Sequence, residues 1–119
     1  MMDGTFVPIA DADELAPDTM KAFELEGKRL LLVRAGDDFF VVDEMCTHEE
    51  YSLALGCIKG KRIKCSLHGS YFDLESGEPD EEPAEEPICS YRVRVAEGRV
   101  WVDPTRLREG ASGRCAPES

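Results

Sequence analysis

Two short pairs of metal-binding residue types stand out in this chain. Cys46-Thr47-His48 forms the first pair and Cys65-Ser66-Leu67-His68 the second, with 16 residues between His48 and Cys65. His48 and His68 are the only two histidines of the chain. Two thiolates and two imidazoles can hold a [2Fe–2S] cluster, with both sulfurs on one iron and both nitrogens on the other. The chemistry of such a site is one-electron transfer.

Mixed ligation has consequences for where the ligands should lie. Neutral imidazoles in place of two thiolates remove negative charge, so the reduction potential rises relative to an all-cysteine cluster. The imidazole-bound iron takes the electron. We therefore expect His48 and His68 at the protein surface and Cys46 and Cys65 on the inner side.

Two other kinds of site use the same residue types. A structural Cys2His2 zinc site has the right ligands, but its usual pattern pairs Cys with Cys and His with His. Here each pair holds one of each. A Cys/His nucleophilic site needs one cysteine and one histidine and leaves the second pair unexplained. Both alternatives stay open at this point, although the spacing favours the cluster.

The elements that must position these residues are short strands. Alternating or continuous apolar segments bounded by turn residues predict strands at 5–9, 20–25, 29–34, 39–42, 63–65, 71–73, 90–95 and 99–102. This spacing predicts an all-β sandwich or barrel, with the ligand loops inserted at about 44–73. We expect residues 1–103 to form a single domain and the polar residues 104–119 a flexible tail.

Bulk composition excludes several classes of protein. A chain of 119 residues has room for one domain. Its longest apolar runs, 30–33 and 39–42, are far too short to span a membrane, and no signal peptide is visible, so we expect a cytoplasmic protein. Five cysteines argue against a complete disulfide framework. We expect Cys57, Cys89 and Cys115 to be free thiols, with Cys57 and Cys89 buried.

The charge balance is strongly acidic. Fourteen basic residues against 25 acidic ones give a net charge of −11. Nucleic acid is therefore a poor candidate partner, because its phosphates repel such a surface. A basic protein surface is a good one, because opposite fields raise the rate of encounter.

The wider sequence resembles the Rieske [2Fe–2S] family over most of residues 5–103. The matching residues are Cys46-Thr47-His48, Gly56, Ile63-Lys64-Cys65-Ser66-Leu67-His68-Gly69, Phe72-Asp73, Ser76-Gly77, Pro79, Pro83, Pro87, Tyr91 to Val95, Gly98 and Val100 to Val102. The resemblance implies the Rieske fold, an antiparallel β-sandwich with an inserted cluster-binding subdomain. It also implies one [2Fe–2S] cluster per chain, held by Cys46, His48, Cys65 and His68.

Individual residues separate the branches of this family. Terminal ring-hydroxylating oxygenases also carry a mononuclear iron held by two further histidines, and this chain has none left. Respiratory members carry a loop disulfide at positions that are Tyr51 and Leu67 here. In those members a serine and a tyrosine also donate hydrogen bonds to the cluster. Ser70 retains the serine, but Phe72 lacks the hydroxyl, so the resemblance implies a lower potential.

With those two branches set aside, the chain is similar to the small ferredoxins of bacterial aromatic-ring dioxygenase systems, of the biphenyl and carbazole types. The resemblance implies a monomeric electron carrier, not an enzyme. It would shuttle electrons from a flavin-containing NAD(P)H reductase to a terminal oxygenase in aromatic hydrocarbon catabolism. The alternative is the Rieske-type small subunit of an assimilatory nitrite reductase.

Acidic residues follow the first ligand pair directly. We expect Glu49 and Glu50 to border the exposed histidines and to meet basic residues of both redox partners, with Tyr51 and Leu67 as an apolar centre. Glu49 departs from the small residue common at this position of the family. The acidic run at 80–86 is better explained as a solvated loop.

Overall fold

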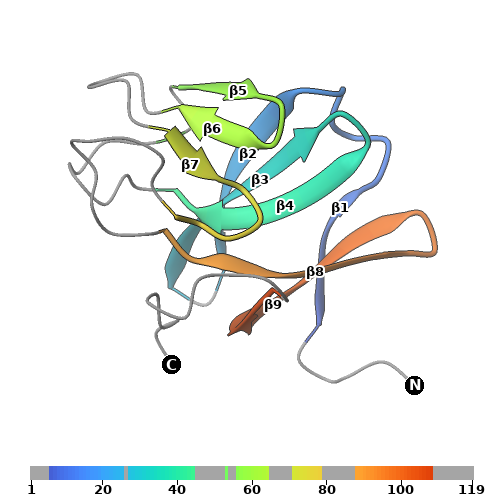
Figure 1. Cartoon of the computed structure of the whole chain (residues 1–119). Coiled ribbons are helices and arrows are strands. Elements are labelled where there is room, and N and C mark those ends of the chain that lie inside the picture. The colour runs from blue at the N-terminus through green and yellow to red at the C-terminus, as the bar shows by residue number, and fades with distance from the viewer. Residues whose placement is uncertain are drawn as a thin grey trace.

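The computed structural model describes residues 6–25, 27–44, 53, 56–64, 71–78 and 88–108, and only the backbone of residues 104–106. The regular structure of this part is nine strands, β1 Val7–Asp11, β2 Thr19–Leu25, β3 Lys28–Ala35, β4 Asp38–Asp43, β5 Cys57–Lys59, β6 Arg62–Lys64, β7 Tyr71–Asp73, β8 Ser90–Ala96 and β9 Arg99–Leu107. They form a six-stranded sheet in the order β1-β9-β8-β4-β3-β2 and a three-stranded sheet in the order β5-β6-β7 (Figure 1). Every pairing is antiparallel, which confirms the predicted all-β class.

The two sheets pack together around a first hydrophobic core. From the large sheet, alternate residues of β3 such as Leu31 and Val33 point into this core, together with Phe40 of β4. From the small sheet, Ile63 of β6 and Phe72 of β7 meet them, and all of these side chains are buried. This contact joins the small sheet to β3 and β4, and Figure 1 shows it seated against that part of the large sheet.

A second core lies on the other face of the large sheet. Leu30 and Leu32 of β3 cluster there with Val100 and Val102 of β9, although β4 and β8 separate these strands in the sheet. The sheet must therefore curl round this face. The continuous apolar run 30–33 follows from this arrangement, because a strand buried on both faces loses the polar alternation of a half-exposed strand.

Most expected strands are confirmed within one or two residues. The exceptions are β5, which was not expected, and β9, which continues to Leu107. Residues 104–107 therefore extend a strand where the tail was expected to begin. The backbone N–H of Arg108 also donates to the Ser90 carbonyl at 2.9 Å. Residues 109–119 lie outside the described residues, so a flexible tail there stays a prediction.

The cysteines outside the ligand pairs differ from expectation. Cys57 is a free thiol as predicted, but it is exposed, because its side chain lies on the outer face of β5. Cys89 is buried as predicted, yet it is disulfide-bonded to a partner outside the described residues, so the prediction of a free thiol is wrong. Cys115 is also outside the described residues.

Among the residues that the structure describes, no helix is long and apolar enough to cross a membrane.

Candidate metal centre

The four predicted ligands, Cys46, His48, Cys65 and His68, lie outside the described residues, as do Glu49, Glu50, Tyr51, Leu67 and Ser70. The structure describes the segments that hold both ends of each ligand loop. The first loop leaves after β4 and Glu44 and returns at Leu53. The second follows β6 at Lys64 and ends where β7 begins at Tyr71.

Hydrogen bonds close the base of the first loop. The Leu53 N–H donates to the Glu44 carbonyl at 2.6 Å, which brings the two ends of the loop together. The Glu44 N–H in turn donates to the Arg29 carbonyl of β3 at 3.2 Å. Leu53 is buried in the first core. The loop that carries Cys46 and His48 is therefore anchored at both ends to the large sheet.

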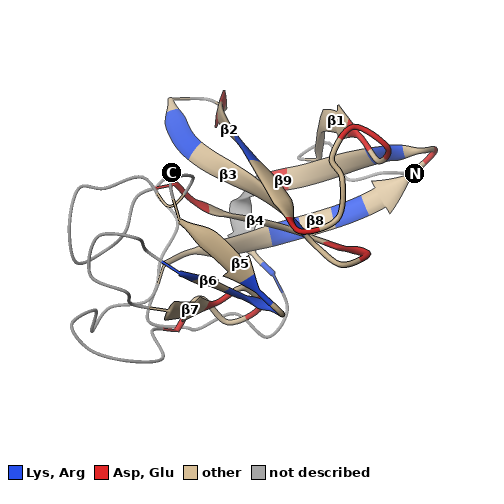
Figure 2. Cartoon of the chain, turned by 90° about the horizontal axis from the view of Figure 1, so that it is seen from above, with Lys and Arg blue, Asp and Glu red and all other residues tan. Residues whose placement is uncertain are grey.

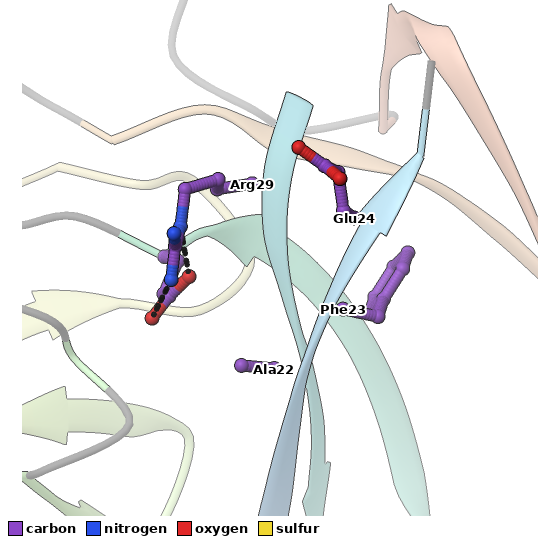
Figure 3. A pocket seen from close by; sticks show the side chains of 5 residues that line it. Ala22, Phe23, Glu24 and Arg29 are labelled. Carbon is purple, nitrogen blue, oxygen red and sulfur yellow. Dashed lines mark hydrogen bonds and ion pairs between the residues drawn. The ribbon is translucent and has the colours of Figure 1, made fainter. Parts of the chain in front are cut away.

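An ion pair reinforces the same anchor. Arg29 Nε donates to Glu44 Oε1 at 2.9 Å, and Arg29 Nη2 donates to Oε2 at 3.4 Å. The Glu44 side chain is 5% exposed and that of Arg29 is 67% exposed. The hydrogen bond and the charge of Glu44 raise the pKa of Arg29. The pair forms part of a surface pocket of about 220 Å³ with Ala22, Phe23 and Glu24 of β2, where the dashed lines of Figure 3 mark the contacts of Arg29.

Asp43 holds the end of β4 against the start of β8. Its Oδ1 accepts a hydrogen bond from the Tyr91 hydroxyl at 2.8 Å, and its Oδ2 accepts one from the Cys89 N–H at 2.9 Å. The Asp43 N–H donates back to the Cys89 carbonyl at 3.1 Å. Three bonds at one residue fix the strand from which the first ligand loop departs.

Gly56 brings the two loops close to each other. A Cβ added at Gly56 would lie 1.7 Å from the carbonyl oxygen of Lys64, the residue directly before Cys65. The Gly56 N–H also donates to the Leu53 carbonyl at 3.0 Å. Only glycine permits this approach of the end of one loop to the start of the other. Both cysteine loops are thereby tied to one small region of backbone.

The small sheet presents the second loop. Lys64 pairs with both Cys57 and Tyr71 at the loop end of this sheet. The adjacent row of Ile58, Ile63 and Phe72 points inward, and Phe72 is fully buried. Phe72 is therefore a core residue, and it has no hydroxyl that could donate a hydrogen bond.

A tight turn follows β7. Asp73 Oδ1 accepts hydrogen bonds from the Glu75 and Ser76 N–H groups at 2.8 and 3.0 Å. Gly77, at φ +80°, then donates to the Asp73 carbonyl at 2.7 Å, and its own carbonyl accepts a bond from the Ile88 N–H at 2.8 Å. The motif Phe72-Asp73 and Ser76-Gly77 is thus a structural turn that returns the chain to β8.

Sequence reasoning missed three of the supporting residues. Arg29, Asp43 and Glu44 carried no motif, and each acts on a partner at least 15 positions away. The weak signal for Asp43 and Glu44 was a pair of acidic residues directly after the apolar segment 39–42. The role of Gly56 was visible only as a family match.

The donor set suits a [2Fe–2S] cluster. Two cysteines and two histidines supply the thiolates and imidazoles that such a group takes. Their loops start and end on residues that the structure holds together, through the Glu44–Leu53 bond at one base and the Gly56–Lys64 contact between them.

Comparison with known proteins gives consistent matches. The family model of the Rieske [2Fe-2S] domain matches residues 5–92. Ferredoxin CarAc of Metapseudomonas resinovorans is 32% identical over 102 residues, which cover 85% of this chain and 95% of the relative. The solved ferredoxin of carbazole 1,9a-dioxygenase from Nocardioides aromaticivorans IC177 superimposes with a TM-score of 0.80 at 32% identity, covering 85% of this chain and 99% of that one. The ferredoxin in a solved complex with the oxygenase of carbazole 1,9a-dioxygenase has a TM-score of 0.79 at 29% identity, covering 92% and 97%.

Proposed function

Because this chain belongs to the Rieske [2Fe–2S] family, we propose that it is the electron-carrying ferredoxin of an aromatic-ring dioxygenase system. It takes electrons from a flavin-containing NAD(P)H reductase and delivers them one at a time to the terminal oxygenase. The observation that carries this proposal is similarity to a carbazole dioxygenase ferredoxin along 99% of that chain's length. The protein is an electron-transfer component and not an enzyme.

The proposed ligands are Cys46, His48, Cys65 and His68. A [2Fe–2S] cluster bound there supplies a centre that accepts and releases a single electron. The chain contributes the two anchored loops that hold it. Arg29 and Glu44 fix the base of the first loop, and the Gly56–Lys64 contact sets the start of the second. Rigid loop bases support fast electron exchange, because little of the protein needs to rearrange.

The finer points of the proposal concern partners and place. We propose a cytoplasmic monomer that leaves one partner before it meets the next. The oxygenase is supported by the relative that was solved in complex with one. The contacts of Glu49 and Glu50 with basic partner surfaces stay a prediction. A nitrite reductase subunit has less support, because Ferredoxin CarAc and the two solved ferredoxins of carbazole dioxygenase match this chain over almost their whole length.

Electron paramagnetic resonance tests both the cluster and its ligands. Dithionite-reduced protein should give a rhombic signal with an average g value below that of all-cysteine [2Fe–2S] proteins. His68→Ala should lose this signal, whereas a variant at an exposed residue of the other sheet, Arg94→Gln, should keep it. A colourless protein that contains zinc and gives no signal on reduction would refute the proposal.

A further inference from the structure

The outer face of the small sheet is basic, in a protein that is otherwise acidic. Lys59, Lys61, Arg62 and Lys64 place four of the chain's 14 basic residues within six positions, and none of residues 57–64 is acidic. The net charge of the whole chain is −11. Figure 2 shows this basic colouring along β5 and β6. A concentration of one sign of charge against the net charge of the molecule needs a reason.

The strand register places these cations on one face. Ile58, Ile63 and Phe72 form the row that enters the first core. The rows on either side must therefore point outward, since successive side chains of a strand alternate. One row holds Lys59, Arg62 and, at its end on β7, Asp73, and the other holds Lys64 with Tyr71. We define the basic strip as Lys59, Arg62, Lys64 and Tyr71.

Acidic neighbours compensate several of the cations outside the strip. Five other basic side chains form ion pairs with acidic ones, namely Lys21, Arg29, Arg34, Lys61 and Arg99. Lys61 in the turn between β5 and β6 reaches Asp38 at 3.7 Å and Glu75 at 3.4 Å. Within the described part of the chain, Lys59 and Lys64 make no such pair.

Two interactions within the strip have opposite effects. One lowers the stability of the sheet, and the other fixes the cationic side chains in place. Lys59 lies directly opposite Arg62, and like charges at facing positions disfavour a sheet. The cationic groups of Arg62 and Lys64 lie 5.9 and 5.7 Å from the centre of the Tyr71 ring. Contacts of this kind stabilise a cation at a defined place on the surface. Arg62 faces Asp73 on its other side, which offsets part of this repulsion. The strip is therefore an organised surface on which the cations of Arg62 and Lys64 are held against Tyr71.

The strip flanks the second ligand loop in the sequence. Lys64 directly precedes Cys65, and Tyr71 is the third residue after His68. A macromolecule seated on Lys64 and Tyr71 would thus lie beside the second ligand loop. Electron transfer falls steeply with distance, so this is a useful place for a redox partner to dock.

We propose that the basic strip docks a redox protein that carries acidic side chains around its own redox centre. The inference rests on the proposed carrier function and adds a second docking chemistry to the acidic residues after His48. A protein patch suits the strip better than nucleic acid or anionic lipid does, because an extended polyanion would also meet the repulsion of the remaining acidic surface. Such a contact is small and transient, and its charges act mainly on the rate of encounter.

Stopped-flow kinetics with two probe proteins tests the strip. Reduced holoprotein is mixed with cytochrome b5, whose haem edge is acidic, or with cytochrome c, whose haem edge is basic. Lys59→Gln/Lys64→Gln should lower the second-order rate with cytochrome b5 by about three- to tenfold at low ionic strength. The rate with cytochrome c should not fall. The matched control, Arg92→Gln/Arg94→Gln, removes the same charge from exposed positions on β8 and should change the cytochrome b5 rate less than the strip variant does.

Several results would overturn the proposal. If the two double variants changed the cytochrome b5 rate equally, the effect would come from the net charge of the protein and not from the strip. Loss of heparin binding in the strip variant without any change in electron-transfer rate would assign the strip to a polyanion. If the double glutamine variant loses its cluster, Lys59→Gln alone, which is farther from Cys65, must still lower the rate with cytochrome b5, and Lys59→Arg must keep the wild-type rate. A silent spectrum in the wild type itself would contradict the carrier function and not this inference.

Discussion

Gly56→Ala should disrupt the junction between the two ligand loops. The new Cβ would lie 1.7 Å from the Lys64 carbonyl oxygen, 2.9 Å from its carbonyl carbon and 3.3 Å from the Leu53 carbonyl oxygen. All three neighbours are backbone atoms, so no side chain can rotate to make room. For the new Cβ to lie 3.0 Å from the Lys64 carbonyl oxygen, that oxygen must move by about 1.3 Å.

The size of this effect follows from what Lys64 does. It pairs with Cys57 and Tyr71, so its displacement strains all three strands of the small sheet. Forcing extra volume into a packed site typically costs 1–3 kcal/mol, and here we expect about 3 kcal/mol or more because backbone must move. Cys65 is the next residue, so the proposed ligand should also be displaced. We therefore expect cluster content to fall together with stability.

Gly60→Ala is the matched control. Gly60 lies in the turn of the same sheet at φ +61°, and a Cβ there would meet nothing within 4 Å. The substitution carries only the left-handed backbone cost of about 1–2 kcal/mol. Urea unfolding gives the stability of both variants, and iron per chain with visible absorbance gives cluster content. A Gly56→Ala protein that holds a full cluster and is as stable as the Gly60→Ala protein would refute the reasoning.

Two further predictions concern the ion pairs. Arg29→Met removes two hydrogen bonds from the buried Glu44 carboxylate and should lower the free energy of unfolding in urea titrations. Arg94→Met, on an exposed site, should lower it by less, and equal effects would contradict the anchoring role. The hydrogen bond from Lys21, together with its charge, lowers the pKa of Glu14, so the pair's contribution to stability is present above the unfolded pKa of glutamate and is lost as pH falls through the lowered folded value. Lys21→Met should raise the pKa of Glu14 toward its ordinary value in an NMR titration, whereas Lys28→Met should leave it unchanged; no change in the Lys21 variant would show that the pair does not form in solution.

The local pattern of the chain predicted most strands and the whole proposed donor set. The run 30–33 and the segment 71–73 carry apolar residues at positions that a strand buries, so their structure follows from neighbours in sequence. The residue types and spacing at 46, 48, 65 and 68 favour a [2Fe–2S] cluster over a zinc site, because each pair holds one cysteine and one histidine.

Tertiary structure alone decided what holds those residues in place. β5 has only three residues and exists because β6 pairs with it. The Arg29–Glu44 pair and the bonds of Asp43 to Cys89 and Tyr91 join residues 15 to 48 positions apart. Which of the basic residues face solvent depended likewise on strand register. Such pairs leave no periodic signal in the sequence, because their free energy depends on distances that only the folded backbone sets.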